Sequence, residues 1–223
     1  MGEIPGARQR LDRLSQSLRV RLTELVAQLT PQAGNALFMP AEPKVVDWHE
    51  PLRYQYSATA RGERPVSEDL AAFAGRAGQL LLAAGWEAVE ERSADGGVVV
   101  TGRHEGNVIE ILLSDDEPGV LYKGRTPALP LSTATAPQRP EPVRTSGTVS
   151  EGHVLCYECD GLGWCPTCAG RGWVPDAERG QRPCPECLRE RVCPVCRGAG
   201  QLYIADLRPS ERAMYPELRE TPK

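Results

Sequence analysis

The sequence lacks several segments by which common protein classes are recognised. No apolar run approaches the roughly eighteen residues of a transmembrane helix, so a membrane protein is not expected. The first twenty residues carry charges throughout and contain no apolar core segment, so no secretory signal peptide is visible. We therefore expect a cytoplasmic protein with reduced cysteines, because disulfide frameworks belong to oxidising compartments.

Motifs of common enzymes are missing as well. The chain has no glycine-rich phosphate loop, no nucleophile elbow and no Ser/His/Asp arrangement at recognisable spacing. His49 precedes Glu50, but a lone histidine in a loop is more often a surface residue than a metal ligand or a catalytic group. These absences predict a protein that is not an enzyme.

Lysine is scarce and the overall charge is modest. Only three of the 26 basic residues are lysines, and the heavy use of Ala, Gly, Pro and Arg resembles a high-GC actinobacterial proteome. With 223 residues, 40% apolar content and a net charge of −4, the chain can form one modest core and a metal-stabilised module.

Cysteine, in contrast, is concentrated in one stretch. All eight cysteines form four Cys-x-x-Cys pairs, separated by five, fifteen and five residues. Each pair offers two thiolates from one tight turn, and two pairs complete the tetrahedron of a structural zinc site. The pattern therefore predicts two zinc ions per chain. The expected ligands are Cys156 and Cys159, Cys165 and Cys168, Cys184 and Cys187, and Cys193 and Cys196.

The spacing alone leaves the combination of pairs open. Nested pairing joins the inner pairs across the fifteen-residue gap, a standard zinc spacing, and closes a second site from the outer pairs. Sequential pairing leaves only five residues in which the chain must reverse, so nested pairing is favoured. Iron–sulfur clusters and a thioredoxin-like centre are weaker alternatives, because the tight cysteine runs of ferredoxins and a βαβ scaffold are missing.

Glycines follow most of these pairs. Residues 156–163, 165–172 and 193–200 are three copies of Cys-x-x-Cys-x-Gly-x-Gly, whereas residues 184–191 keep the cysteines and lack both glycines. Glycine permits positive φ, so the turn can aim backbone N–H groups at the thiolates. Over residues 153–204 the chain resembles the cysteine-rich zinc domain of DnaJ-type chaperones.

This resemblance implies two zinc ions in nested pairing, the first motif with the fourth and the second with the third. It also implies a surface that binds a protein partner or an extended peptide. The His-Pro-Asp tripeptide by which that family stimulates a partner ATPase occurs nowhere in the sequence. A complete co-chaperone is therefore not expected.

Residues 1–30 are expected to form an amphipathic helix, with regular periodicity over 7–29. Apolar residues recur at steps of three and four, and most arginines lie off that stripe. The stripe favours packing onto the rest of the protein, with a short self-association helix, and hence a homo-oligomer, as the alternative. It consists of Leu11, Leu14, Leu18, Leu22, Leu25, Val26 and Leu29.

Two further segments follow the helix. Residues 31–65 are rich in proline yet carry Trp and Tyr, so we expect an ordered, irregular segment with a strand at 52–58. Residues 66–126 predict a small α+β domain, whose helix starts at the acidic turn Ser67–Asp69 and ends at Gly85. An antiparallel meander should complete it, with strands at 86–92, 98–104, 108–114 and 120–122 and a turn at 94–97.

The predicted meander carries several carboxylates. Because strand residues alternate between two faces and no positioned partner is evident, solvent exposure is favoured over acid/base catalysis. The carboxylates are Glu90, Glu91, Glu110, Asp115 and Asp116.

The remaining segments complete an α+β fold class. Residues 127–150 are rich in Pro, Thr and Ser and predict a semi-extended linker. Residues 151–205 form the DnaJ-like zinc module, expected to be a cysteine-rich hairpin, and residues 206–223 form a tail. We therefore expect an N-terminal helix, a small helix-plus-meander domain and a C-terminal two-zinc module.

Two classes of binding function remain for the module. Tyr157, Trp164, Trp173 and Tyr203 could form an aromatic surface for a protein or an extended peptide. Nucleic-acid binding is less favoured because acidic and basic residues nearly balance between Glu151 and Asp206. A thiol–disulfide oxidoreductase is weaker still. The favoured interpretation is a non-enzymatic, chaperone-like adaptor.

Overall fold

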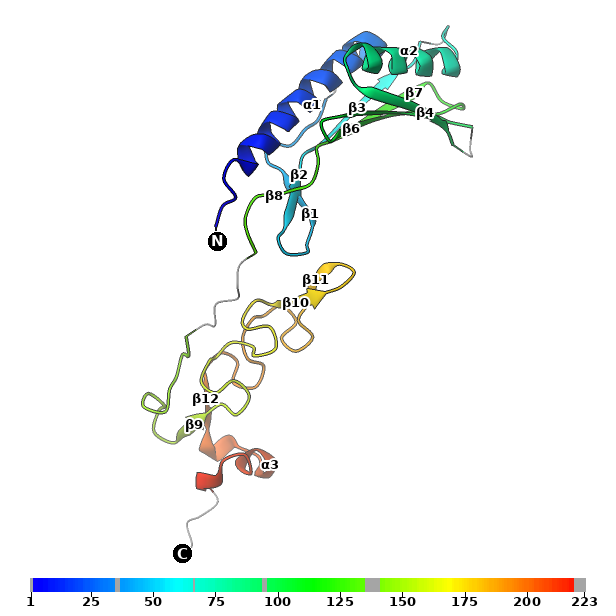
Figure 1. The fold of residues 1–223 in the computed structure, drawn as a ribbon. Helices are drawn as coiled ribbons and strands as arrows, with labels where there is room; N and C mark the ends of the chain where they lie inside the picture. Colours follow the sequence, from blue (N-terminus) through cyan, green and yellow to red (C-terminus); the bar gives the residue numbers. More distant parts are fainter. Residues whose placement is uncertain (1, 35–36, 66, 94–95, 135–140, 219–223) are drawn as a thin grey trace, which may run out of the picture. The chain divides into compact units, whose positions relative to one another are not determined.

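The chain folds as two compact units, Met1–Ala134 and Thr135–Lys223 (Figure 1). The structure is a computed structural model that describes residues 2–34, 37–65, 67–93, 96–134 and 141–218. The predicted turn residues Ala94 and Asp95, and the linker residues Pro137 and Pro140, lie outside the described residues.

A five-stranded antiparallel sheet forms the framework of the first unit. Its order is β3-β7-β6-β5-β4, so the predicted meander is present and an additional strand lies beside its last strand. That additional strand, β3, comes from the proline-rich segment, and only its first two residues fall within the strand predicted at 52–58. The strands are β3 (Ser57–Glu63), β4 (Glu87–Arg92), β5 (Val98–His104), β6 (Asn107–Leu113) and β7 (Gly119–Arg125).

Two helices cover one face of this sheet (Figure 1). They are α1 (Ala7–Leu29) and α2 (Leu70–Ala83). Glycines in the sheet let them approach closely, because a Cβ at Gly124 would stand 2.5 Å from Leu22 Cδ1. The pattern repeats under α2, where a Cβ at Gly102 would lie 2.8 Å from Leu81 Cδ2.

The leucine stripe of α1 is buried in the core of its own unit. All seven apolar residues of the predicted stripe are buried, and most belong to the cluster that includes the inward residues of β5, β6 and β7. The favoured expectation, packing onto the rest of the protein, is therefore confirmed. At the start of α2, the side chain of Asp69 accepts a hydrogen bond from Ala72 N at 2.7 Å, which caps the helix where the acidic turn was predicted.

The first unit also contains a smaller sheet that was not predicted, although one of its strands, β2, falls within the strand predicted at 52–58. This smaller sheet has the antiparallel order β1-β2-β8 and combines the proline-rich segment with the beginning of the predicted linker. Phe38 also forms an isolated bridge with Thr59 on β3, and the 3₁₀-helix η1 (Pro31–Ala33) follows α1. The strands are β1 (Lys44–Asp47), β2 (Arg53–Gln55) and β8 (Leu129–Pro130).

The second unit contains two short antiparallel ribbons with the cysteine turns between them. Its tail folds back, because Tyr215 Oη donates to Leu155 O at 2.6 Å and Leu207 is buried beside Val154. The ribbons are β9 (His153–Leu155) with β12 (Gln201–Tyr203), and β10 (Trp173–Asp176) with β11 (Gly180–Pro183). The tail elements are η2 (Ile204–Asp206), α3 (Pro209–Arg212) and η3 (Pro216–Leu218).

The protein is therefore a mixed α and β structure with antiparallel sheets, and its described residues include three α-helices. None of the helices in these ranges is both long enough and apolar enough to cross a bilayer.

Candidate metal centre

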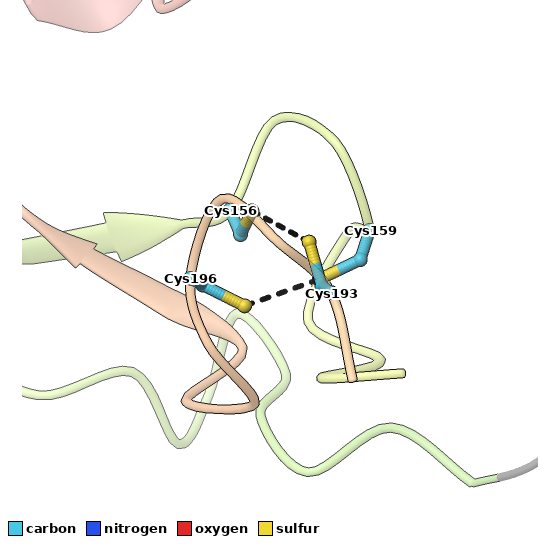
Figure 2. Close-up of side chains that lie close together, drawn as sticks. All are labelled: Cys156, Cys159, Cys193 and Cys196. Carbon is cyan, nitrogen blue, oxygen red and sulfur yellow. Dashed lines mark hydrogen bonds between the residues drawn. The ribbon is translucent and has the colours of Figure 1, made fainter. Parts of the chain in front are cut away.

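The eight cysteines gather into two groups of four. Within each group the sulfur atoms all lie within 4.8 Å of one another, and every cysteine is at most 7% exposed. Figure 2 shows the outer group, in which Cys156 faces Cys193 at 3.9 Å and Cys159 faces Cys196 at 3.7 Å between Sγ atoms. Four sulfurs around one zinc ion would lie roughly 3.8 Å apart, so the group fits a tetrahedral ion.

The inner group has the same dimensions. Cys165 and Cys184 are 3.8 Å apart between Sγ atoms, and Cys168 and Cys187 are 3.7 Å apart. The arrangement is nested: the β10–β11 hairpin returns the third pair to the second, and the β9–β12 ribbon joins the segments beside the first and fourth pairs. The short gaps of five residues instead connect one group to the other.

Reciprocal backbone hydrogen bonds join the two turns of each group. In the outer group, Cys156 N donates to Gly200 O at 3.0 Å and Cys193 N donates to Gly163 O at 2.8 Å. Each turn thus fixes the backbone of the first cysteine of its partner turn. In the inner group the equivalent bonds run from Cys165 N to Arg191 O at 2.9 Å and from Cys184 N to Gly172 O at 3.1 Å.

Backbone N–H groups after the turns point at sulfur. Such donors stabilise the ionised form of a thiol, which is the form that binds metal. The sequence predicted that the glycines after a cysteine pair let the turn aim N–H groups at the thiolates, and in three turns the second glycine of the motif is the donor. The bonds run from Gly163 N to Cys159 Sγ at 3.3 Å, and from Gly172 N to Cys168 Sγ and Gly200 N to Cys196 Sγ at 3.2 Å.

The turn without glycines has the same backbone conformation. Leu188, Arg189 and Arg191 have φ values of 47°, 77° and 69°, and the glycines that correspond to the two arginines in the first turn, Gly161 and Gly163, have 80° and 72°. Burial raises the pKa of the Cys187 thiol, and the backbone N–H of Arg191 opposes this rise, as the N–H of Gly163 does at Cys159. A left-handed conformation costs a residue with a Cβ about 1–2 kcal/mol, so this turn is held by its surroundings.

Burial and hydrogen bonding act in opposite directions on the thiols. Burial raises the pKa of Cys156, raises that of Cys159 to about 11 and raises that of Cys165 to about 12. Burial also opposes ionisation of Cys184, but hydrogen bonds from the backbone of its own turn and from the thiols of Cys187 and Cys165 outweigh it and lower the pKa to about 7. Backbone N–H groups likewise outweigh burial at Cys196 and lower its pKa. Four crowded thiolates need a cation, so metal binding should release protons.

Part of the predicted linker packs against the outer group. Arg144 N donates to Gly161 O at 3.0 Å. A Cβ added at Gly163 or Gly200 would lie 2.7 Å from a methyl group of Val143, so this side chain covers both glycines. The sequence offered no signal for this contact beyond a single valine in a proline-rich segment.

The four predicted aromatic residues differ in exposure and in the side chains they contact. Tyr203 is 49% exposed and its ring lies 5.1 Å from that of His153. Trp173 lies under the guanidinium of Arg171, 4.5 Å from its ring centre. Tyr157 and Trp164 are half-buried.

Two pockets open beside the β9–β12 ribbon. One, of about 450 Å³, is lined in part by Val195, Leu202 and Tyr203. The other, of about 560 Å³, is lined in part by Tyr157 and Met214, the latter 63% exposed. The tail contributes to both pockets, a role that its sequence did not indicate.

The polar candidates of the first unit lie apart from any such group. His49 Nδ1 is 2.7 Å from Asp47 on an exposed loop, as expected of a surface histidine. Glu110 is paired with Arg125 at 2.8 Å, and the other four predicted carboxylates are exposed. Across the described ranges, only the two cysteine groups bring three or more potential metal ligands together.

The fold and the site define a protein with two buried tetracysteine groups, each suited to binding a zinc ion. A tetrahedral set of four sulfurs is typical of zinc or iron–sulfur sites. No protein family model, curated protein or solved structure matches the chain.

Proposed function

We propose that this protein is a non-enzymatic adaptor whose DnaJ-like module binds two zinc ions and holds a protein partner in extended conformation. The closure of both metal groups supports this proposal most strongly. A catalytic zinc keeps one coordination position open for water or substrate, whereas a four-cysteine site has none. The cysteines are at most 7% exposed, which also opposes thiol–disulfide exchange with another protein.

The pocket beside β12 is the proposed peptide site. Among the described residues β12 pairs only with β9, so one side of its backbone can accept a further strand. Val195, Leu202 and Tyr203 provide apolar surface in the adjacent pocket of about 450 Å³, which is large enough for a side chain of the peptide. We therefore propose that an extended peptide adds to β12 and inserts an apolar residue beside Tyr203.

The charge of the module favours a protein over a nucleic acid. Residues 151–206 contain eight acidic and six basic residues, a formal charge of −2. Each zinc ion with four thiolates adds about two negative charges by ion counting. Phosphate backbones are bound by surfaces with an excess of positive charge, so this module would repel them.

Fluorescence anisotropy of labelled extended peptides with the zinc-loaded full chain tests the proposal. Peptides with a central aromatic or aliphatic residue should bind, and Tyr203→Ser should weaken that binding at least several-fold. Leu188→Asn is the matched control, because Leu188 is 74% exposed on the module and lies outside both pockets. Equal binding by both variants, or binding only to a labelled oligonucleotide, would refute the peptide site.

A further inference from the structure

The face of the five-stranded sheet opposite α1 and α2 carries an ordered row of side chains. The row crosses all five strands as directly paired neighbours, and its three central members alternate along their strands with residues buried under the helices. Both helices of this unit lie on the other face (Figure 1), so the row is on the open side. From β3 to β4 it consists of Arg61, Leu121, Leu112, Val99 and Glu91.

Several large apolar side chains lie on the open face. Leu121, Leu112 and Val99 are incompletely buried and line a groove of about 500 Å³. Phe38 and Val89, at opposite edges of the face, are 68% and 54% exposed. Phe38 lies on this face because it is paired with Thr59, whereas its neighbours in sequence pack into the core. Contiguous apolar surface with charged ends is typical of an interface.

The order of the row is self-complementary. It runs from a positive residue through three apolar residues to a negative residue. If a two-fold axis runs along the central strand β6, Leu112 meets its own copy and Leu121 meets Val99 of the second copy. Arg61 then meets Glu91 of the second copy, and the reverse pair forms at the other edge. A two-fold interface requires such a surface, which matches itself after rotation.

We infer that this sheet face binds a second copy of the chain and forms a sheet-on-sheet homodimer. The association uses β6 and its neighbours instead of the N-terminal helix, because the leucine stripe of α1 is buried within its own unit.

The rest of the face indicates where contact is closest. Glu110 lies on the proposed axis, but Arg125 compensates its charge at 2.8 Å. In the row beyond, Arg103 and Arg125 of the two copies would face each other. Aligned sheets cross at about 30° because each is twisted, so corners of the two faces diverge. The closest contact is therefore placed on the Leu112 row.

The size of the face predicts a dimer that dissociates on dilution. Five strands about 4.8 Å apart, four of them seven residues long and β4 six, give a face of roughly 20 by 23 Å. This footprint corresponds to the smaller interfaces between proteins, for which dissociation constants on the order of micromolar are common.

Sedimentation velocity of the zinc-loaded full chain over the micromolar range tests the inference. As the concentration of the unmodified chain rises, its average mass should increase from that of a monomer to that of a dimer. Leu112→Asp, Arg61→Glu and Glu91→Arg should each raise the dissociation constant at least tenfold. Combining Arg61→Glu with Glu91→Arg should restore the dimer, because opposite charges face each other again. Glu90→Arg is the matched control on the other face of β4 and should dimerise normally.

Circular dichroism of each variant establishes that it is folded. The inference can be tested even if Leu112→Asp does not fold. Arg61→Glu and Glu91→Arg should each weaken the dimer, and the double variant that carries both changes should regain it. An unmodified chain that stays monomeric throughout, or a dimer that resists both single charge reversals, would overturn the inference.

Discussion

Gly163 and Arg191 occupy equivalent positions in the first and third cysteine turns, with φ values of 72° and 69°. Adding a Cβ at Gly163 and removing the Cβ at Arg191 should therefore change metal affinity in opposite directions. Gly163→Ala introduces a Cβ into a left-handed residue, whereas Arg191→Gly removes one. We expect the first change to weaken metal binding by the outer group and the second to strengthen it in the inner group.

The magnitudes follow from local geometry. A Cβ at Gly163 would stand 2.6 Å from the carbonyl oxygen of Gly198, so the two turns of the outer group would have to separate. Left-handed strain and overpacking together should cost about 2–4 kcal/mol. Arg191→Gly removes the strain but frees the unfolded chain, for a net gain of about 0.5–1 kcal/mol.

Competition with a chromogenic zinc chelator measures both effects. At about 1.4 kcal/mol per tenfold change, zinc affinity should fall by roughly thirty-fold or more in Gly163→Ala and rise by roughly two- to five-fold in Arg191→Gly. Arg182→Gly, an exposed arginine on β11, is the matched control and should not raise affinity. If Arg191→Gly weakens zinc binding, or Gly163→Ala leaves it unchanged, the strain argument is refuted.

Three other predictions concern metal, folding and pH. Cys193→Ser should reduce the metal content from two ions to one in native mass spectrometry, because the inner group keeps all four ligands; a chain that still binds two ions would contradict the need for four cysteines per ion. Chelation should remove hydrogen-exchange protection from residues 151–205 and leave protection of the five-stranded sheet intact, since the two units have separate cores; loss of protection in both units would show that they are coupled. Burial raises the pKa of Tyr122 to about 12, so its contribution to stability is present below pH 10 and is lost as pH rises toward 12. On the order of 3 kcal/mol of unfolding free energy at most should disappear over that interval in urea titrations, and Tyr122→Phe should abolish this tyrosine-dependent loss.

Regular, local patterns could be predicted from sequence. The apolar stripe of α1 and the acidic cap of α2 depend on residues within one or two turns, and the helices occur at the predicted positions. The meander could be predicted equally well. Strand β5 spans 98–104 as expected, and the ends of the other strands differ from the prediction by one to a few residues. These elements are specified by the alternation of nearby side chains.

Elements that depend on distant partners were missed or predicted only in part. β3 joins β7 more than fifty residues away, and β8 pairs with β2 from within a predicted linker. Neither strand has an alternation that identifies its partner. The tail was similarly ambiguous, because Tyr215 becomes informative only when its hydroxyl reaches Leu155.

The sequence by itself determined which residues could hold metal and how many ions they could serve, because eight cysteines in four pairs admit little other chemistry in a reduced chain. The tertiary structure decided which pairs come together and how a turn without glycines keeps the same geometry at Arg189 and Arg191. It also decided that the leucines of α1 are internal and that the row centred on Leu112 lies on an open face. The physical reason is that ligand type is a property of single residues, whereas pairing and exposure depend on where the chain returns.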